Sequence, residues 1–344
     1  MGNGLGCIPG TQPNGGVGSR SKSNSRSQRK TITEEDLLHR QALAMAIQQH
    51  QLSQRFDGSM SRRIGSTSSR KQTPSSSFRK PVPIVLDSLE TKKIILVHGE
   101  GFGAWCWYKI IPLLEEAGLH PVALDLMGSG IDHTDVNSIL TLADYTKPLL
   151  DYLHNLHEDE KVILVGHSCG GACVSYALEC FPKKVTKAVF LGATMVCDGQ
   201  RPFDVFAEEL ASAEVFLQES QLLLYANGND KPPTGLMLDK EKLKGLYFNQ
   251  SPSKDIALAS VSMRPIPLAP IMENLSLTVE NYGSVRRYFI QMLDDRVLSS
   301  YIQEKLVREN PPQEVFKLRG SDHCPFFSKP QSLCKILLEI VQLI

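Results

Sequence analysis

The chain has 344 residues, 42% of them hydrophobic, which is enough for one large domain or two ordinary ones with a substantial core. Its zero net charge hides an asymmetry, because residues 1–80 carry 13 of the 37 basic side chains but only 4 of the 37 acidic ones. A basic arm therefore precedes an acidic body. No apolar run approaches the roughly 20 residues that cross a bilayer, and the start lacks the apolar core of a secretory signal. These observations argue against a transmembrane segment and against secretion.

The first 85 residues are dominated by Ser, Gly, Arg, Lys, Gln and Pro, and we expect a disordered extension with a short helix at about 34–52. Its basic, hydroxyl-rich composition is typical of a plastid transit peptide. Two alternatives stay open: acylation at Gly2 and Cys7, which would lead to the plasma membrane, and an untargeted cytoplasmic tail. A nucleic-acid-binding arm is disfavoured because no base-stacking aromatic residues lie among the charges.

Residues 86–344 alternate apolar runs with helical patterns. Apolar strands without polar alternation, joined by helices, predict a parallel sheet covered on both faces. This alternation of strands and helices is interrupted at about 194–282, a segment that we interpret as a helical cap insertion. The expected strands are 93–97, 120–126, 161–165, 185–191, 287–292 and 314–318, and the expected helices are 105–117, 142–156, 170–180, 301–308 and 330–343.

A candidate nucleophile lies in Gly166-His167-Ser168-Cys169-Gly170, between an expected strand and an expected helix. A serine hydroxyl needs a base to become nucleophilic, and hydrolases of the α/β-hydrolase fold place it on a strained turn flanked by small residues. The five-residue pattern alone is weak, and an ordinary glycine-rich turn would also produce it. Its position after a buried strand favours Ser168 as a nucleophile.

The partners of such a serine follow in a fixed chain order, first an acid and then a histidine. His323 comes directly after the last expected strand and is the candidate base. Asp294 follows the preceding strand and is our choice for the acid, with Asp295 as the alternative. Asp322 is too close in sequence to reach the histidine ring in the usual geometry, and we expect it to be a turn residue.

An acyl-transfer reaction also needs two backbone N–H donors for the oxyanion, one directly after the nucleophile and one in the loop after an earlier strand. The N–H groups of Cys169 and Glu100 fit these two places. The eight cysteines show no CxxC pair and no partnered histidine, so we expect no metal site and mainly buried free thiols.

These motifs together resemble the plant methylesterase family, over about residues 92–344. The resemblance rests on Val97-His98-Gly99, Gly103-Ala104-Trp105-Cys106-Trp107-Tyr108-Lys109, Gly166-His167-Ser168, Ser251-Pro252, Leu258-Ala259-Ser260, Arg264-Pro265 and Gly283-Ser284-Val285. It implies an α/β-hydrolase fold and hydrolysis of small methyl esters, such as methyl indole-3-acetate, methyl jasmonate and methyl salicylate, without a cofactor. The basic extension is similar to that of the chloroplast-directed subgroup.

The resemblance assigns Ser168 as nucleophile, His323 as base and then acid, Asp294 as the orienting carboxylate, and the N–H groups of Glu100 and Cys169 as the oxyanion hole. Two residues depart from the family: Glu100 stands where a small residue is usual, and Phe102 where many members have His. A carboxylate beside a developing oxyanion would oppose it. Only the backbone donor is needed, so the Glu100 side chain can point elsewhere, and a side chain that stays beside the oxyanion would impair activity.

Two rival functions share the fold. Hydroxynitrile lyases have a Thr and a Lys at the places that Gly99 and Cys324 occupy here, which argues against that chemistry. A hormone-binding receptor needs no triad, so the three ordered residues favour an enzyme. The expected partner is a small-molecule ester, and a homodimer is allowed but not specified by the sequence.

Overall fold

The computed structural model describes residues 89–205 and 221–343. The basic extension, its expected short helix at 34–52, and part of the expected cap lie outside the described residues. Among the described residues, no helix combines the length and apolar character that crossing a bilayer requires. Within the same ranges no cluster of His, Cys, Asp and Glu has the arrangement of a metal site.

A six-stranded, fully parallel sheet forms the centre of the described region, with the strand order β2-β1-β3-β4-β8-β9. The strands are β1 (Lys93–Val97), β2 (His120–Leu124), β3 (Val162–His167), β4 (Val185–Leu191), β8 (Arg286–Met292) and β9 (Glu314–Leu318). All six strands predicted from the sequence are confirmed, with shifts of at most two residues at their ends.

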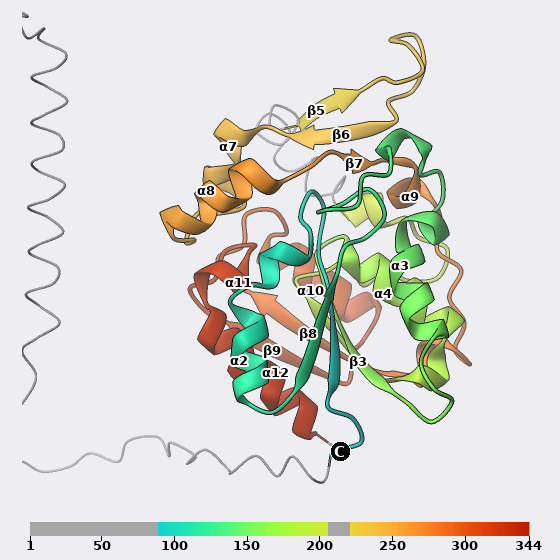
Figure 1. Cartoon of the computed structure of the whole chain (residues 1–344), viewed down its shortest axis with the longest axis vertical. Helices are drawn as coiled ribbons and strands as arrows, with labels where there is room; N and C mark the ends of the chain where they lie inside the picture. Colours follow the sequence, from blue (N-terminus) through green and yellow to red (C-terminus); the bar gives the residue numbers. More distant parts are fainter. Residues whose placement is uncertain (1–88, 206–220, 344) are drawn as a thin grey trace, which may run out of the picture. The chain divides into compact units, whose positions relative to one another are not determined.

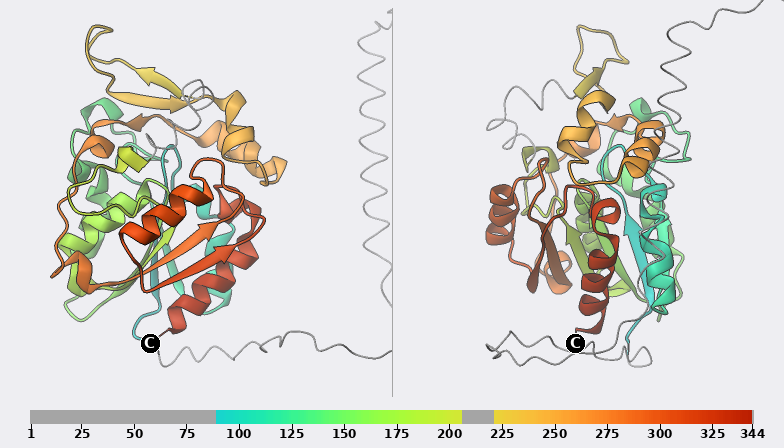
Figure 2. Two further views of the ribbon diagram at one scale, coloured as in Figure 1. Left: turned by 180° about the vertical axis from the view of Figure 1, so that it is seen from behind. Right: turned by 90° about the vertical axis from the view of Figure 1, so that its left-hand side faces the viewer.

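Alternate residues of each strand enter two separate cores, one on each face of the sheet. Ile94 and Leu96 of β1 belong to one core, and Ile95 and Val97 belong to the other. Strands buried on both faces must be apolar throughout, which explains the continuous apolar runs of the sequence. Helices therefore cover both sides of the sheet (Figures 1 and 2).

The first core is closed by α2 (Ile110–Glu116), α11 (Pro325–Ser328) and α12 (Pro330–Gln342), and the second by α3 (Leu142–His154), α4 (Gly170–Cys180) and α10 (Ser300–Glu309). The single helix expected at 105–117 is in fact two pieces, because the short 3-10 helix η2 (Ala104–Trp107) precedes α2. The other 3-10 helices are η3 (Val136–Ser138), η4 (Pro182–Lys184) and η5 (Tyr282–Ser284).

The cap contains helices α7 (Lys240–Leu246), α8 (Ser253–Ser262) and α9 (Ala269–Met272), as expected, but also a three-stranded antiparallel sheet. Its strands are β5 (Gln221–Leu224), β6 (Gly235–Leu238) and β7 (Ile266–Pro267). The expectation of a helical cap was therefore incomplete. β5 and β6 are short apolar runs without polar alternation, and such runs do not distinguish a strand from a buried helix.

The cap packs against the loops that follow the sheet strands. Arg264 N–H donates to the carbonyl oxygen of Gly101 at 3.0 Å, and Gln250 N–H donates to the Asp322 carboxylate at 2.9 Å. Figure 1 shows the cap elements β5–β7, α7 and α8 beyond the ends at which β1 and β3 finish. Carboxyl ends of parallel strands are the usual place for a binding site in α/β folds, and here the cap covers them.

Candidate active site

Ser168 lies on the turn between β3 and α4. Its φ of 49° makes it the only non-glycine residue with a positive φ among residues 89–205 and 221–343. Such a conformation costs about 1–3 kcal/mol and persists only where the surroundings enforce it. The carbonyl oxygen of Ser168 accepts hydrogen bonds from Thr194 N–H at 3.0 Å and from Gly171 N–H at 3.0 Å. The turn is therefore held in its strained shape from two sides.

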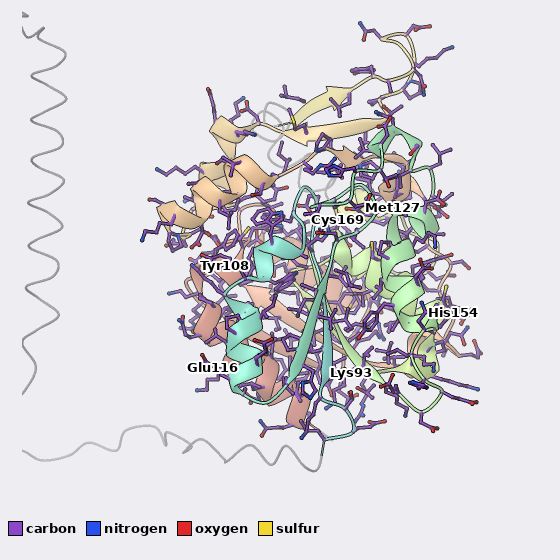
Figure 3. The ribbon with its side chains drawn as sticks, viewed as in Figure 1. Lys93, Tyr108, Glu116, Met127, His154 and Cys169 are labelled. Atoms are coloured by element: carbon purple, nitrogen blue, oxygen red, sulfur yellow. The ribbon has the colours of Figure 1, made fainter. Side chains whose placement is uncertain are left out.

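The two glycines of the motif are required by space. A Cβ atom on Gly166 would lie 2.8 Å from Val174 Cγ2, and one on Gly170 would lie 2.4 Å from the carbonyl oxygen of His98. Side chains at either position would push α4 away from β1 and β3. Figure 3 labels Cys169, which begins this turn-to-helix junction beneath the cap. The small residues of the motif thus allow the close packing that fixes Ser168.

His323 lies in the loop between β9 and α11 and is fully buried. Its Nε2 is 2.9 Å from Ser168 Oγ, and its Nδ1 is 2.8 Å from Asp295 Oδ2. Because a carboxylate only accepts, the ring donates from Nδ1 and leaves Nε2 to accept the serine proton when the ring is neutral. The three side chains have the geometry of a serine–histidine–aspartate triad.

The choice of Asp294 as the acid was wrong, because the carboxylate bonded to the histidine is that of Asp295. Asp294 is exposed and its Oδ2 accepts from Gly320 N–H at 2.7 Å. Asp295 is buried, and its Oδ1 accepts from the N–H groups of Val297 and Leu298 at 2.8 and 3.0 Å. These two bonds orient its other oxygen toward His323. The alternative that the sequence left open, Asp295, is the residue in contact.

His167 steadies the backbone of the candidate base. Its Nε2 lies 2.7 Å from the carbonyl oxygen of His323, so this nitrogen carries the proton. Burial, followed by the positive charge of His323, lowers the pKa of His167 to about 3, and the ring is therefore neutral. His98 has a structural role, because its Nε2 accepts from Leu126 N–H at 3.0 Å.

The expected oxyanion donors surround a carboxylate instead of an empty space. Cys169 N–H donates to Glu100 Oε2 at 3.2 Å, and the Tyr247 hydroxyl donates to Glu100 Oε1 at 2.9 Å. The backbone N–H of Glu100 also stabilises its own carboxylate. Of the two orientations that the sequence leaves open for Glu100, the structure has the one in which the carboxylate lies at the expected oxyanion donor, the Cys169 N–H. The rotamer of Glu100 depends on Tyr247, a cap residue far away in the sequence that sequence reasoning missed.

The candidate base lies between two carboxylates. Glu100 Oε1 is 3.6 Å from His323 Nε2, on the opposite side of the ring from Asp295. Burial alone would lower the pKa of His323, but Asp295 and then Glu100 raise it to about 10. Burial likewise opposes ionisation of Glu100, yet His323 holds the pKa of Glu100 well below its usual value. In this state the histidine is cationic at neutral pH.

The space beside these groups is small and mostly apolar. A cavity of about 30 Å³ adjoins Glu100 and Cys169, and its apolar walls come largely from the cap: Phe203, Leu236, Leu238, Ile266 and Ile271. Phe203 and Leu236 also line a neighbouring cavity of about 610 Å³ between the cap sheet, η3 and α9. Such walls suit an apolar organic group with few polar atoms.

The site also bears on the lyase alternative. A Cβ atom at Gly99 would lie 2.8 Å from both His167 Nδ1 and Ser168 Cβ. Hydroxynitrile lyases have a threonine at this position, and this backbone has no room for its side chain. Asp322 accepts from Cys324 N–H at 3.0 Å, as expected of a turn residue. Asp125, whose Oδ1 accepts from Ala104 N–H at 2.6 Å, also has a structural position.

Seven cysteines are described, and all seven are free thiols. Five of them are buried, which agrees with the expectation from the sequence, whereas Cys180 is exposed and Cys197 is partly exposed. Burial raises the pKa of Cys169, beside the candidate nucleophile, well above its ordinary value. That thiol is therefore protonated and does not compete with Ser168 as a nucleophile.

Residues 94–336 match the sequence model of the "Alpha/beta hydrolase family". The Arabidopsis thaliana protein named "Putative methylesterase 12, chloroplastic" is 66% identical over 96% of this chain and 95% of its own length. Methyl jasmonate esterase 1 of Vitis vinifera is 37% identical over 73% of this chain and 97% of its own.

Among solved structures, the methylesterase MES16 from Arabidopsis superposes with a TM-score of 0.66 and 35% identity, covering 73% of this chain and 99% of that one. Polyneuridine aldehyde esterase gives a TM-score of 0.68 at 31% identity, with coverage of 73% and 99%.

Proposed function

Because this chain belongs to the alpha/beta hydrolase family and, within it, to the plant methylesterases, we propose that it is a carboxylesterase that hydrolyses methyl esters of small carboxylic acids. The observation that carries the proposal is the position of the His323 ring, 2.9 Å from Ser168 Oγ and 2.8 Å from Asp295 Oδ2. The reaction consumes one water and releases the free acid and methanol.

In the proposed mechanism Ser168 Oγ attacks the ester carbonyl carbon while neutral His323 takes the hydroxyl proton. Asp295 stabilises the imidazolium that results. The tetrahedral oxyanion is bound by the N–H groups of Cys169 and Glu100, and its collapse breaks the bond to the methoxy oxygen, which leaves as methanol with the proton from His323. Water, deprotonated by His323, then hydrolyses the acyl-enzyme and restores Ser168.

The substrates we propose are methyl esters of plant hormone acids, such as methyl indole-3-acetate, methyl jasmonate and methyl salicylate. Support comes from the relative named methyl jasmonate esterase 1 and from the apolar cap walls at the site. These acids combine one carboxyl group with an apolar ring system. Such a molecule matches a cavity in which apolar cap walls adjoin a few polar groups, those of Glu100 and Tyr247.

We also propose the chloroplast as the site of action. The relatives named methylesterase 12, 14 and 11 all carry the word "chloroplastic", and methylesterase 12 matches this chain over nearly its whole length. The basic, serine-rich first 85 residues fit that destination.

The decisive test of the activity is a comparison of the full chain with Ser168→Ala on a panel of hormone methyl esters, with methanol release as the readout. We expect the natural chain to hydrolyse at least one ester and the variant to fall by a factor of about 10⁴ or more to the background rate. Equal background hydrolysis by both proteins on every ester would contradict the proposal.

A second candidate function is supported by one observation, the hydrogen bond from Cys169 N–H to the Glu100 carboxylate. A protein whose oxyanion hole stays filled would bind a ligand without converting it. Calorimetric binding of an intact ester by the natural chain, with no methanol released, would favour this ligand-binding function over the esterase.

A further inference from the structure

We propose that Glu100 is a gate: its carboxylate fills the oxyanion hole, and ester hydrolysis requires that it first leave. This inference rests on the proposed esterase function and adds a control that neither the family nor the named relatives assign. Glu100 is 6% exposed and comes from the loop after β1, while its partners come from the turn after β3, from the cap and from the loop after β9. Four parts of the chain therefore converge on one carboxylate.

The Glu100 carboxylate accepts hydrogen bonds that a substrate oxyanion would need. Cys169 N–H, the donor expected after the nucleophile, points at Glu100 Oε2 over 3.2 Å. The other expected donor, the N–H of Glu100, also stabilises the same carboxylate. A carbonyl oxygen cannot take the Cys169 N–H proton while the Glu100 carboxylate already accepts it, because the group has one proton to donate.

The remaining space supports the same conclusion. The cavity beside Glu100 and Cys169 is small, about 30 Å³, which is room for two or three water molecules at about 10–15 Å³ each. A methyl ester with an apolar ring system is larger than two or three water molecules. An ester can thus reach Ser168 only when the Glu100 side chain vacates its place.

The charge of Glu100 acts on the base as well. With Asp295 on one side of His323 and Glu100 3.6 Å from the other, the imidazolium is stabilised and the pKa of His323 rises to about 10. A cationic histidine cannot accept the serine proton. Glu100 thus opposes hydrolysis in two ways, by filling the hole and by keeping the base protonated.

The cap holds the gate closed through Tyr247, which follows α7. Its hydroxyl donates to Glu100 Oε1 at 2.9 Å, and burial with the nearby carboxylate raises the pKa of Tyr247, so the phenol keeps its proton. Movement of α7 would break this bond and release the carboxylate. We infer that opening of the cap and opening of the oxyanion hole are one event.

The test uses the full chain and a fluorophosphonate probe, which reacts with activated serines without requiring a particular ester, together with kcat/KM for p-nitrophenyl acetate. The variants are Glu100→Ala, Glu100→Gln and Tyr247→Phe. Glu115→Ala is the matched control, because it also removes one acidic charge but lies exposed on α2. Glu100 has a negative φ, so alanine fits its backbone.

Glu100→Ala, which empties the hole, should raise both rates at least tenfold, because a single oxyanion donor contributes about 10²–10³ in kcat. Glu100→Gln should give a smaller rise, since the amide loses the charge but keeps the bulk. Tyr247→Phe should also raise both rates, and Glu115→Ala should change neither. The gate would be overturned if Glu100→Ala kept the thermal unfolding midpoint of the natural chain but reacted no faster than it in both assays.

A pH profile of probe labelling separates the gate from a general structural effect. The ionisable groups that face His323 are Asp295, Glu100, His167, Tyr247 and Cys324. For the natural chain the rate should rise about tenfold per pH unit from pH 7 toward pH 10, as His323 becomes neutral. In Glu100→Gln the midpoint of this pH profile should move to lower pH. An unchanged midpoint of the profile would contradict the gate.

The same labelling distinguishes failure of the gate from failure of the esterase function. If the natural chain and Glu100→Ala label equally fast, and Ser168→Ala does not label, the serine is reactive and only the gate is refuted. If no variant labels faster than Ser168→Ala, the esterase function fails together with the gate.

Discussion

Asp294 and Asp295 are adjacent acids with different partners, and this difference is measurable. Asp295→Asn should lower kcat/KM by about 10⁴-fold, because an amide can stabilise the wrong tautomer of His323 and cannot balance the imidazolium charge. Asp294→Asn is the matched control, since it makes the same chemical change one residue earlier, in a side chain that accepts from Gly320 N–H. We expect it to lower kcat/KM less than threefold.

Steady-state kinetics on p-nitrophenyl acetate, or on any methyl ester that the chain hydrolyses, checks this pair of variants. A larger loss for Asp294→Asn than for Asp295→Asn would contradict the arrangement around His323. Both variants should keep the far-ultraviolet circular dichroism of the natural chain, so that a loss of activity is not a loss of fold.

Some residues of the site could be predicted from the sequence and others could not. Ser168 and His323 could be placed because motif, chain order and strand ends all agree, and the structure brings them together. The acid could not be fixed to one residue, because the turn after β8 decides which of two neighbouring carboxylates faces inward. The Glu100 rotamer depends on Tyr247, 147 positions away, and no local pattern encodes that contact.

At the scale of elements, helix α8 of the cap is joined to the body of the enzyme by a buried carboxylate. Asp255 is 1% exposed, and its two oxygens accept from Tyr108 Oη and Lys109 Nζ, each at 2.5 Å. Removing Asp255 breaks two hydrogen bonds to a charged group, each worth about 1.5–3 kcal/mol, although Tyr108 and Lys109 are 45% and 26% exposed and can be hydrated. This network therefore contributes to holding the cap over the site.

Asp255→Ala should lower the free energy of unfolding by about 2 kcal/mol, a value reduced from that of a fully buried pair because Lys109 is 26% exposed. Asp151→Ala is the control, since it breaks the exposed helical pair with Lys147 and should cost no more than about 0.5 kcal/mol. Urea unfolding followed by circular dichroism measures both. Equal stability of the two variants would show that the Asp255 network is not part of what holds the cap.

Element boundaries in the body follow the sequence closely for a physical reason. Strands buried on both faces are continuous apolar runs, and here they end where glycine or histidine begins a loop, so β1 and β4 were predicted with the bounds they have. The cap sheet lacks such signals. β7 has only two residues, and β5 and β6 are joined by a ten-residue connection, too long for a tight hairpin turn to mark them.

At the scale of the whole molecule, the fold class could be predicted because alternation of strands and helices leaves few arrangements for a parallel sheet. The order of the strands within the sheet is a different matter. β8 lies beside β4, although the cap separates them in sequence by almost a hundred residues. That pairing depends on two distant apolar faces fitting together and has no local signature.

The separation of charge along the chain gives the last prediction. The first 80 residues hold 13 basic and 4 acidic side chains, and a basic leader of this kind is typical of import into plastids. A fluorescent protein that carries residues 1–85 at its N-terminus should enter chloroplasts in leaf cells. Its Gly2→Ala variant, which cannot be myristoylated, should show the same distribution, because acylation plays no part in import.

Confocal imaging against chlorophyll autofluorescence distinguishes the three destinations that the sequence leaves open. Plasma-membrane signal that disappears in Gly2→Ala would show that acylation, and not import, directs the protein. Diffuse cytoplasmic signal from both fusions would show that the extension contains no targeting signal. Chloroplast signal for both would place an esterase with a closed oxyanion hole inside the plastid, where an ester that opens the cap would have to be present for it to act.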